Sequence, residues 1–410
     1  MTTGRSVLIA GGGIGGLCAA LCLARRGFDV TVLERSPEFG EIGAGLQLAP
    51  NATRVLRSLG LLDAVLEVGV LPDRLVLADV TTDEELTALD VTGFGEQFGG
   101  PYVVAHRSDV LSILLRACLA DASVRLLTSK TVVRVVEPDA GTVRAECADG
   151  TSYDGDVLVG ADGLRSTVRK LIDDSEPVFS GYVAYRGAVP TERVAARSDS
   201  RDVVAFIGHG RHFVQYPLRS GSFYNQVAVF RSARYLAGEP NWGTPEELET
   251  AFEPSSARIR TALSAIERGM SWPMYDREPL TRWVHGRSVL LGDAAHPMLQ
   301  YLAQGACQAI QDADCLAYSL SGAVEAGRDV IDGFTEYQQH RMGPAQRTQQ
   351  NARVWGDIWH TDGLAETLRN AYLRERDPND LRHVAPFYAL AETCSHSVRG
   401  GLSRAEPSPA

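Results

Sequence analysis

The stretch Val7-Leu-Ile-Ala-Gly11-Gly-Gly13-Ile-Gly15-Gly16 decides the fold, because a run typical of a buried strand breaks directly into glycines. Gly11, Gly13 and Gly16 match the pattern G-x-G-x-x-G. In that pattern the first glycine permits a tight turn and the second lets the backbone approach a pyrophosphate. The third lets the following helix pack closely against the strand. An anion then binds at the N-terminus of that helix.

The residues after the glycines complete a nucleotide-binding unit. An apolar helical pattern follows from Leu17 to Gly27, and the strand pattern that begins at Asp29 ends in Glu34. A carboxylate about 20 residues beyond the glycines can accept hydrogen bonds from ribose hydroxyls. Because the glycine pattern stands in a complete strand, loop, helix, strand and acid order, we expect a bound dinucleotide.

Composition narrows the class of protein. The chain has 410 residues, which favours two domains. A net charge of −11 disfavours nucleic acid as a partner, since phosphate neutralisation needs a basic face. There is no uncharged apolar run long enough to span a bilayer, and no leader peptide precedes the first strand, so we expect a cytoplasmic protein. The seven cysteines are scattered and read as buried apolar residues, and we expect no metal site.

Two further segments decide which dinucleotide is bound. The strand patterns from Asp156 and from Ser288 run into Gly160-Ala-Asp162-Gly163 and Gly292-Asp293, respectively. Both resemble signatures of the class A flavoprotein monooxygenases, and the resemblance covers nearly the whole chain. It implies tight, non-covalent FAD. The alternative, that Asp162 and Asp293 only form turns after strands, stays open. The implied FAD contacts are Gly11, Gly13, Ile14, Gly15, Gly16, Glu34, Arg35, Gln47, Arg107, Asp162, Gly292, Asp293, Gly305 and Ala306.

The same resemblance implies the fold. We expect an α/β chain in which an FAD-binding Rossmann-like domain of the p-hydroxybenzoate hydroxylase type is interleaved with an antiparallel-sheet substrate domain. The FAD-binding domain is expected to comprise residues 1–75, 101–179 and 276–345, and the substrate domain residues 76–100 and 180–275. Residues 346–410 are expected to form a C-terminal helical region whose end is disordered. We also expect an antiparallel meander from Val124 to Gly160 and a glycine loop from Gly40 to Asn51.

Within the family, the chain resembles the 3-hydroxybenzoate 6-hydroxylases. The resemblance rests chiefly on His212-Phe-Val-Gln-Tyr216 and on His296-Pro-Met-Leu-Gln300-Tyr-Leu-Ala-Gln304-Gly305. Many relatives have proline at the position of Gln300, and an amide can bond a substrate hydroxyl where proline cannot. The resemblance implies that His212 and Gln300 hold and deprotonate a phenolic hydroxyl, while Tyr102 and Tyr216 line the pocket. All four could equally be ordinary core or loop residues.

These residues fit one reaction best. A phenol becomes more nucleophilic at its ortho and para carbons when it is deprotonated, so a base at the phenolic oxygen helps an electrophilic hydroxylation. The resemblance implies para-hydroxylation of 3-hydroxybenzoate to 2,5-dihydroxybenzoate (gentisate) through a flavin C4a-hydroperoxide. Dioxygen and NADH or NADPH would be co-substrates, because the chain has no second nucleotide unit. Two alternatives to this reaction stay open: another substrate, either salicylate or a natural-product phenol, and a non-catalytic flavin-binding redox module. The oligomeric state also stays open, with a homodimer as one expectation.

Overall fold

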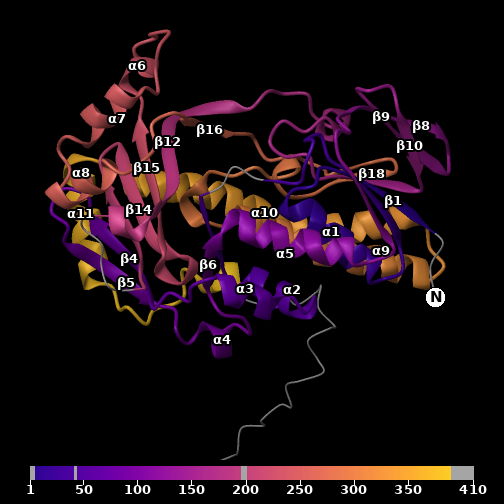
Figure 1. Ribbon diagram of the computed structural model, residues 1–410, viewed down its shortest axis with the longest axis horizontal. Helices are drawn as coiled ribbons and strands as arrows, with labels where there is room; N and C mark the ends of the chain where they lie inside the picture. The colour runs from indigo at the N-terminus through magenta and orange to yellow at the C-terminus, as the bar shows by residue number, and fades with distance from the viewer. Residues whose placement is uncertain (1–4, 41–43, 195–200, 389–410) are drawn as a thin grey trace, which may run out of the picture.

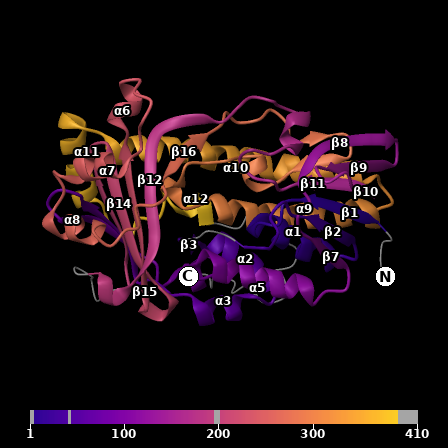
Figure 2. The same ribbon diagram turned by 45° about the horizontal axis from the view of Figure 1, so that its top comes forward.

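Two sheets lie side by side in the computed structural model, which describes residues 5–40, 44–194 and 201–388 (Figure 1). A six-stranded sheet forms one half and a seven-stranded sheet the other. Helix α10 (Val330–His360) runs between the two halves, and Figure 2 shows the same arrangement from another angle. The expected α/β fold, with a nucleotide-binding sheet joined to a second sheet, is confirmed. The second sheet is antiparallel, as expected, except where β13 pairs in parallel with β4.

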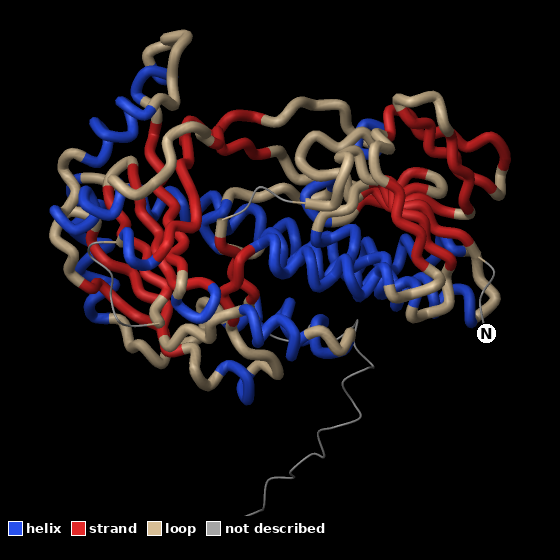
Figure 3. Tube along the Cα trace, in the orientation of Figure 1, coloured by secondary structure: helices blue, strands red, loops and turns tan. Residues whose placement is uncertain are grey.

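The six-stranded sheet has the order β17-β18-β11-β1-β2-β7, with every pair parallel except the one at β17. Helices cover one of its sides and a small antiparallel sheet, β10-β9-β8, the other (Figure 3). Strands covered on both sides are almost continuously apolar, as β11 is and as β1 is after Ser6. The strands are β1 (Ser6–Ala10), β2 (Asp29–Leu33), β7 (Val124–Leu127), β11 (Val157–Gly160), β17 (Val284–His285), β18 (Ser288–Leu290), β8 (Val132–Asp139), β9 (Thr142–Cys147) and β10 (Ser152–Gly155).

The seven-stranded sheet has the order β16-β12-β15-β14-β13-β4-β5. Because side chains alternate along a strand, the two faces of the sheet differ. One face packs on α7 (Pro245–Phe252) and α8 (Ala257–Leu263) through residues such as Phe213, and the other faces α10 and α11 (Gly363–Glu375). Its strands come from two separate parts of the chain, residues 74–90 and residues 178–276. They are β4 (Arg74–Asp79), β5 (Glu85–Asp90), β12 (Val178–Pro190), β13 (Val203–Gly208), β14 (Arg211–Leu218), β15 (Phe223–Arg231) and β16 (Trp272–Asp276).

The helices complete the layers. Helices α1, α5, α9 and α10 pack on one another beneath the six-stranded sheet. The helices besides α10 are α1 (Ile14–Ala24), α2 (Pro50–Ser58), α3 (Leu62–Val68), α4 (Phe94–Gln97), α5 (Arg107–Leu119), α6 (Ala233–Leu236), α7 (Pro245–Phe252), α8 (Ala257–Leu263), α9 (Gly305–Glu325), α11 (Gly363–Glu375) and α12 (Ala385–Tyr388). None of the helices within the described ranges has the length and apolarity that crossing a membrane requires. The expected disordered tail lies outside the described residues.

Two expectations from the sequence are wrong. Val124–Leu127 does not join a meander, because β7 pairs in parallel with β2, as the return strand after α5. A short apolar run does not reveal its pairing partner, so periodicity could not decide between the two sheets. Gly45–Leu48 is also not a loop: it forms β3, which pairs with β6 (Val103–His106). The six cysteines that the structure describes are all buried thiols, and no metal-ligand cluster occurs among the described residues.

Candidate active site

A cavity of about 1330 Å³ lies where the two halves of the molecule meet. It exceeds the roughly 300–1,000 Å³ of a typical small-molecule site, so it has room for a dinucleotide and a second ligand. Of all the site residues expected from the sequence, only Gly16 is outside its wall. A Cβ at Gly16 would lie 2.0 Å from the carbonyl oxygen of Gly11, so this glycine serves close packing inside the loop.

The glycine loop leads into the N-terminus of α1 in the cavity wall. Gly11 has φ +102°, and a Cβ there would lie 2.4 Å from the carbonyl oxygen of Ala161. Helix α1 then begins at Ile14 with no side-chain cap and no acidic residue in its first turn. The first N–H groups of a helix have no partner within it, and they carry partial positive charge. This end of α1 therefore suits a phosphate group.

A second helix begins at the same cavity. The N-terminus of α9, at Gly305 and Ala306, lines the wall and has no side-chain cap. A Cβ at Gly305 would lie 3.8 Å from the Oδ1 of Asp293, so the Asp293 carboxylate lies against the start of this helix. Two uncapped helix ends thus meet one cavity, and both favour electron-rich groups of a ligand.

Glu34 has a role that the sequence did not predict. Its Oε2 accepts a hydrogen bond from the N–H of Gly12 at 2.7 Å, and its Oε1 accepts one from the N–H of Ser36 at 2.8 Å. The carboxylate therefore braces the glycine loop from within the cavity wall. Each oxygen keeps a second lone pair, with which it can still accept a ribose hydroxyl.

The two aspartates expected near FAD differ in their surroundings. Asp162 accepts a hydrogen bond from the N–H of Thr167 at 2.7 Å and another from the Ser166 hydroxyl, and burial raises the pKa of its carboxyl. Asp293 follows Gly292, which has φ +59°, and its side chain is exposed to the cavity. Burial lowers the pKa of the nearby Arg107 guanidinium, and the Asp293 carboxylate opposes that change. Asp293 is therefore the better placed of the two to bond a ligand.

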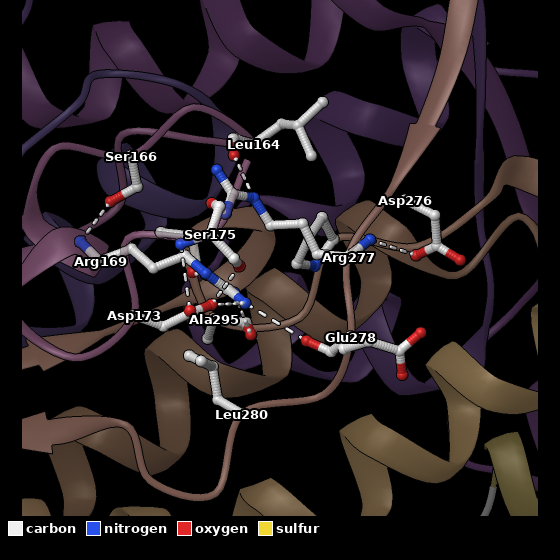
Figure 4. Close-up of polar contacts among 12 residues, drawn as sticks. Leu164, Ser166, Arg169, Asp173, Ser175, Asp276, Arg277, Glu278, Leu280 and Ala295 are labelled. Atoms are coloured by element: carbon white, nitrogen blue, oxygen red, sulfur yellow. Dashed lines mark hydrogen bonds and ion pairs between the residues drawn. The ribbon is translucent and has the colours of Figure 1, made fainter. Parts of the chain in front are cut away.

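Two buried arginines fasten the loops that carry these aspartates (Figure 4). The Nη1 of Arg169 donates to the carbonyl oxygens of Ala294 and Ala295, both at 3.1 Å. The Nε of Arg277 donates to the carbonyl oxygen of Leu164 at 3.0 Å. These guanidinium groups tie the loop after β11 and the loop after β18 to the protein interior. Sequence reasoning missed both, because arginines far apart in sequence give no local signal of their shared contacts.

A buried ion network supports Gly292 from behind. The Oδ2 of Asp312 accepts from the N–H of Gly292 at 3.1 Å and lies 2.5 Å from the Nε2 of His296, while its Oδ1 accepts from the Nε of Arg341 at 2.7 Å. Burial alone would raise the pKa of the Asp312 carboxyl, but His296 and Arg341 lower it to about 2. The Asp312 carboxylate is therefore ionised at neutral pH and holds the backbone at Gly292 through its hydrogen bond.

The aromatic end of the cavity is built from side chains. His212 and Tyr216 both line it from β14, as expected from their alternation. The Tyr102 hydroxyl donates to the Oε1 of Gln47 at 2.6 Å, and burial raises the pKa values of Tyr102 and Tyr216. Gln300 begins a short 3-10 turn, η5 (Gln300–Leu302), and its exposed side chain is in the wall.

Several residues in this end were missed or misread in the sequence. The ring centroid of His212 lies 5.4 Å from that of Tyr301 and 5.1 Å from that of Trp359, and its Nδ1 lies 2.8 Å from the Nε2 of His360. Trp355 and Trp359 also line the cavity, although their spacing on a helix is by itself typical of plain packing. Their spacing of four residues on a helix is the signal that could have placed them on one face.

These residues fit FAD. The uncapped helix ends suit a pyrophosphate and an electron-rich ring, and the cavity is long enough to continue from the glycine loop to His212. In addition, the Nε of Arg186 is buried without a hydrogen-bond partner among the described residues, and burial lowers the pKa of this guanidinium. A buried cation without a carboxylate partner favours an anionic ligand.

Comparison with known proteins agrees with this geometry. The family described as "FAD binding domain" matches residues 5–352. The chain is 42% identical over 383 residues to 3-hydroxybenzoate 6-hydroxylase 1 of Aquipseudomonas alcaligenes, covering 92% of this chain and 95% of the other. It is 34% identical over 388 residues to 3-amino-4-hydroxybenzoate 2-monooxygenase of Streptomyces cremeus, covering 93% and 94%.

Solved structures agree as well. The structure of Klebsiella pneumoniae HpxO complexed with FAD and uric acid has a TM-score of 0.77 and 26% identity, covering 91% of this chain and 93% of the other. Together with the family match and the curated relatives, this similarity favours an enzyme over a non-catalytic flavin module. The chain belongs to the family of FAD-binding class A flavoprotein hydroxylases and is an FAD-dependent aromatic monooxygenase.

Proposed function

We propose that the chain hydroxylates 3-hydroxybenzoate at carbon 6, giving 2,5-dihydroxybenzoate, with NADH or NADPH and dioxygen as co-substrates. The observation that carries the proposal is the position of His212. Its Nδ1 is engaged by His360, whereas its Nε2 has no hydrogen-bond partner among the described residues and is not one of the fully buried polar atoms. Since His212 lines the cavity, Nε2 is available to a phenolic hydroxyl.

The other residues of this end suit a hydroxylated aromatic acid. Gln300 offers an amide in the same wall, and Tyr301 and Trp359 offer aromatic faces around His212. Arg186 and Arg107 place two guanidinium groups in the cavity wall, and guanidinium groups are suited to bind a carboxylate-bearing ligand. The names of three relatives that are 36–42% identical support the same substrate.

In the proposed reaction, FAD supplies the oxidation chemistry, and the residues of this chain prepare the substrate. His212 accepts the phenolic proton at Nε2, which raises electron density at the ring carbon para to the oxygen. For 3-hydroxybenzoate that carbon is carbon 6. Gln300 fixes the oxygen by a hydrogen bond, and the surrounding aromatic rings exclude water from the reacting ring.

A substrate screen tests the proposal. The purified holoenzyme is mixed separately with 3-hydroxybenzoate, salicylate, 4-hydroxybenzoate and 3-amino-4-hydroxybenzoate, and NADH and NADPH oxidation is followed with identification of the products. We expect 3-hydroxybenzoate to give the highest kcat/KM and 2,5-dihydroxybenzoate as its main product. Formation of 3,4-dihydroxybenzoate, or more efficient coupled turnover of salicylate to catechol, would contradict the proposal.

A further inference from the structure

Gln47, expected from the sequence to contact FAD, has its side chain bonded to the aromatic end of the cavity. The Tyr102 hydroxyl donates to its Oε1 at 2.6 Å. Burial raises the pKa of Tyr216, and a hydrogen bond with Gln47 opposes that change. All three side chains line the cavity. One amide therefore joins two tyrosines, one that precedes β6 and one that lies on β14.

The backbone holds Gln47 against the sheet that carries Tyr216. The N–H of Gly45 donates to the Oδ1 of the buried Asn225 at 2.6 Å, and Asn225 lies opposite Tyr216 in the pairing of β15 with β14. A Cβ at Gly45 would lie 2.5 Å from the Tyr216 hydroxyl oxygen, so this close approach requires glycine. Because side chains alternate along a strand, Gln47 lies on the same face of β3 as Gly45. The chain path thus places the Gln47 amide beside the Tyr216 hydroxyl.

The two hydrogen bonds of Gln47 have a direction. Its carbonyl oxygen accepts from Tyr102. A hydrogen bond that lowers the pKa of a phenol is donated to the phenol oxygen, and only the amide N–H groups of Gln47 can donate. Tyr216 therefore keeps its own hydroxyl hydrogen, which is donated to no group among the described residues. Reversing the amide would exchange the two tyrosines, but one hydroxyl hydrogen would still be left for a ligand.

This remaining hydrogen lies in a region that suits an anion. The Arg186 guanidinium lowers the pKa of Tyr216, so its charge is close to the same hydroxyl. Arg186 stacks on the ring of Trp272 at 4.8 Å, and its buried Nε has no partner among the described residues. His212 lies on the same face of β14 as Tyr216, roughly 13 Å away along the strand. That separation leaves room for one aromatic ring between a group that binds a phenol and a group that binds a carboxylate.

We propose that Gln47 is a specificity-determining residue, which fixes the hydrogen bonds of Tyr102 and Tyr216 so that one hydroxyl hydrogen is left for the carboxylate of the substrate. The inference rests on the proposed function, because it requires a substrate that bears a carboxylate in addition to its phenol. Gln47 acts through the tyrosines, without contact with the substrate, and is therefore a positioning residue.

The proposal depends on the amide, which both accepts and donates. An ionised glutamate only accepts, so it would take a hydrogen bond from each tyrosine and leave no hydroxyl hydrogen for the substrate. Its charge would also repel a carboxylate. A methionine, which is similar in length and flexible, would bond neither tyrosine and would leave both hydroxyls without a fixed direction. The two replacements thus disturb the arrangement in different ways.

The test compares Gln47→Glu, Gln47→Met and Tyr216→Phe with a control, Gln339→Glu, in the FAD-loaded full chain. Gln339 is exposed on α10. Isothermal titration calorimetry at about pH 8, where carboxyl groups are ordinarily ionised, measures the Kd of 3-hydroxybenzoate and of 3-hydroxybenzamide. The benzamide keeps the phenol but carries no charge, so the ratio of the two Kd values measures recognition of the carboxylate. FAD content and circular dichroism check folding.

We expect the wild type to prefer 3-hydroxybenzoate by roughly 10–100-fold, as typical for a hydrogen bond to a charged group. This preference should fall at least about fivefold in both Gln47 variants and in Tyr216→Phe, with normal FAD content, and stay unchanged in Gln339→Glu.

Two kinds of result contradict the proposal in different places. An unchanged preference in both Gln47 variants or in Tyr216→Phe overturns the role of Gln47 alone. Loss of FAD from Gln47→Met also overturns it, because the amide would then serve the flavin. Failure of the wild type to bind 3-hydroxybenzoate overturns the proposed function instead.

Discussion

The two ends of the cavity are built in different ways. The nucleotide end is made mainly from backbone: the glycine loop, the starts of α1 and α9, and the turn at Gly292. The aromatic end is made from side chains such as His212, Tyr301 and Trp359, which come from separate elements. A backbone site requires a particular chain path and so leaves a contiguous sequence pattern. A side-chain site needs only suitable groups that meet in space, so its substrate preference can change while the fold stays.

The largest effect is expected from a change at the nucleotide end of the cavity. In Gly13→Val the side chain would occupy the position of the pyrophosphate at the start of α1, so no FAD should copurify. The flavin absorbance of the purified protein measures this. Gly322→Ala is the control, because a Cβ there meets no atom within 4 Å. A yellow Gly13→Val protein with normal FAD content would show that the cavity does not hold the dinucleotide at this loop.

The next largest effect is expected at the proposed base. His212→Ala should leave FAD binding intact but slow hydroxylation by about 10²–10⁴-fold, as typical for loss of a general base. NADH consumption should then yield hydrogen peroxide rather than dihydroxy product. The ratio of peroxide to product measures the effect, and His285→Ala, at an exposed position, is the control. If the ratio of peroxide to product were unchanged in His212→Ala, this histidine would be only a core residue of the sheet.

A third change tests the buried network of Asp312 and Arg341, which lies behind Gly292 at the nucleotide end. Arg341→Met leaves the buried Asp312 without its cation, which should cost about 3–5 kcal/mol of unfolding free energy. The exposed pair Arg328 and Glu336 provides the control, since Arg328→Met should cost no more than about 1 kcal/mol. Urea unfolding of both variants measures the difference. Equal losses would mean that the Asp312 network contributes no more than a surface ion pair.

The same network predicts how stability depends on pH. The pKa of Asp312 is about 2 in the folded protein, below the roughly 3.9 of an unfolded aspartate. Its stabilisation is therefore fully present above the unfolded value and is lost as pH falls through the folded value. Without Arg341, the acid-unfolding midpoint should move to higher pH, as followed by flavin release and circular dichroism.

The smallest effect is expected from the neutral hydrogen bond at the aromatic end. Gln300→Ala should weaken the use of 3-hydroxybenzoate by about 2–13-fold in kcat/KM, corresponding to roughly 0.5–1.5 kcal/mol. Steady-state kinetics measure this, with Gln339→Ala, exposed on α10, as the control. A loss as large as that of His212→Ala would show that the amide does more than orient the oxygen.

The nucleotide end of the cavity could be predicted from the sequence more fully than the aromatic end. The glycine loop was predicted from its own local pattern, and Asp162 and Asp293 from the family resemblance of their motifs. All three line one cavity, because each follows a strand of one parallel sheet. His360 could not be found this way, since a single histidine at the end of a helix is usually a core or surface residue. The pairing of β7 was also missed, because the alternation of a short strand does not record which neighbour it will meet.

Helix α10 sets a limit on how this enzyme could be re-engineered. Its 31 residues carry Arg341, which supports Asp312 behind the flavin loops, and end at His360, which bonds His212. One inserted residue between these two positions would turn one relative to the other by about 100°, since a helix has 3.6 residues per turn. Chimeras that exchange the C-terminal part with a relative must therefore preserve the residue count of α10, or one of the two contacts is lost.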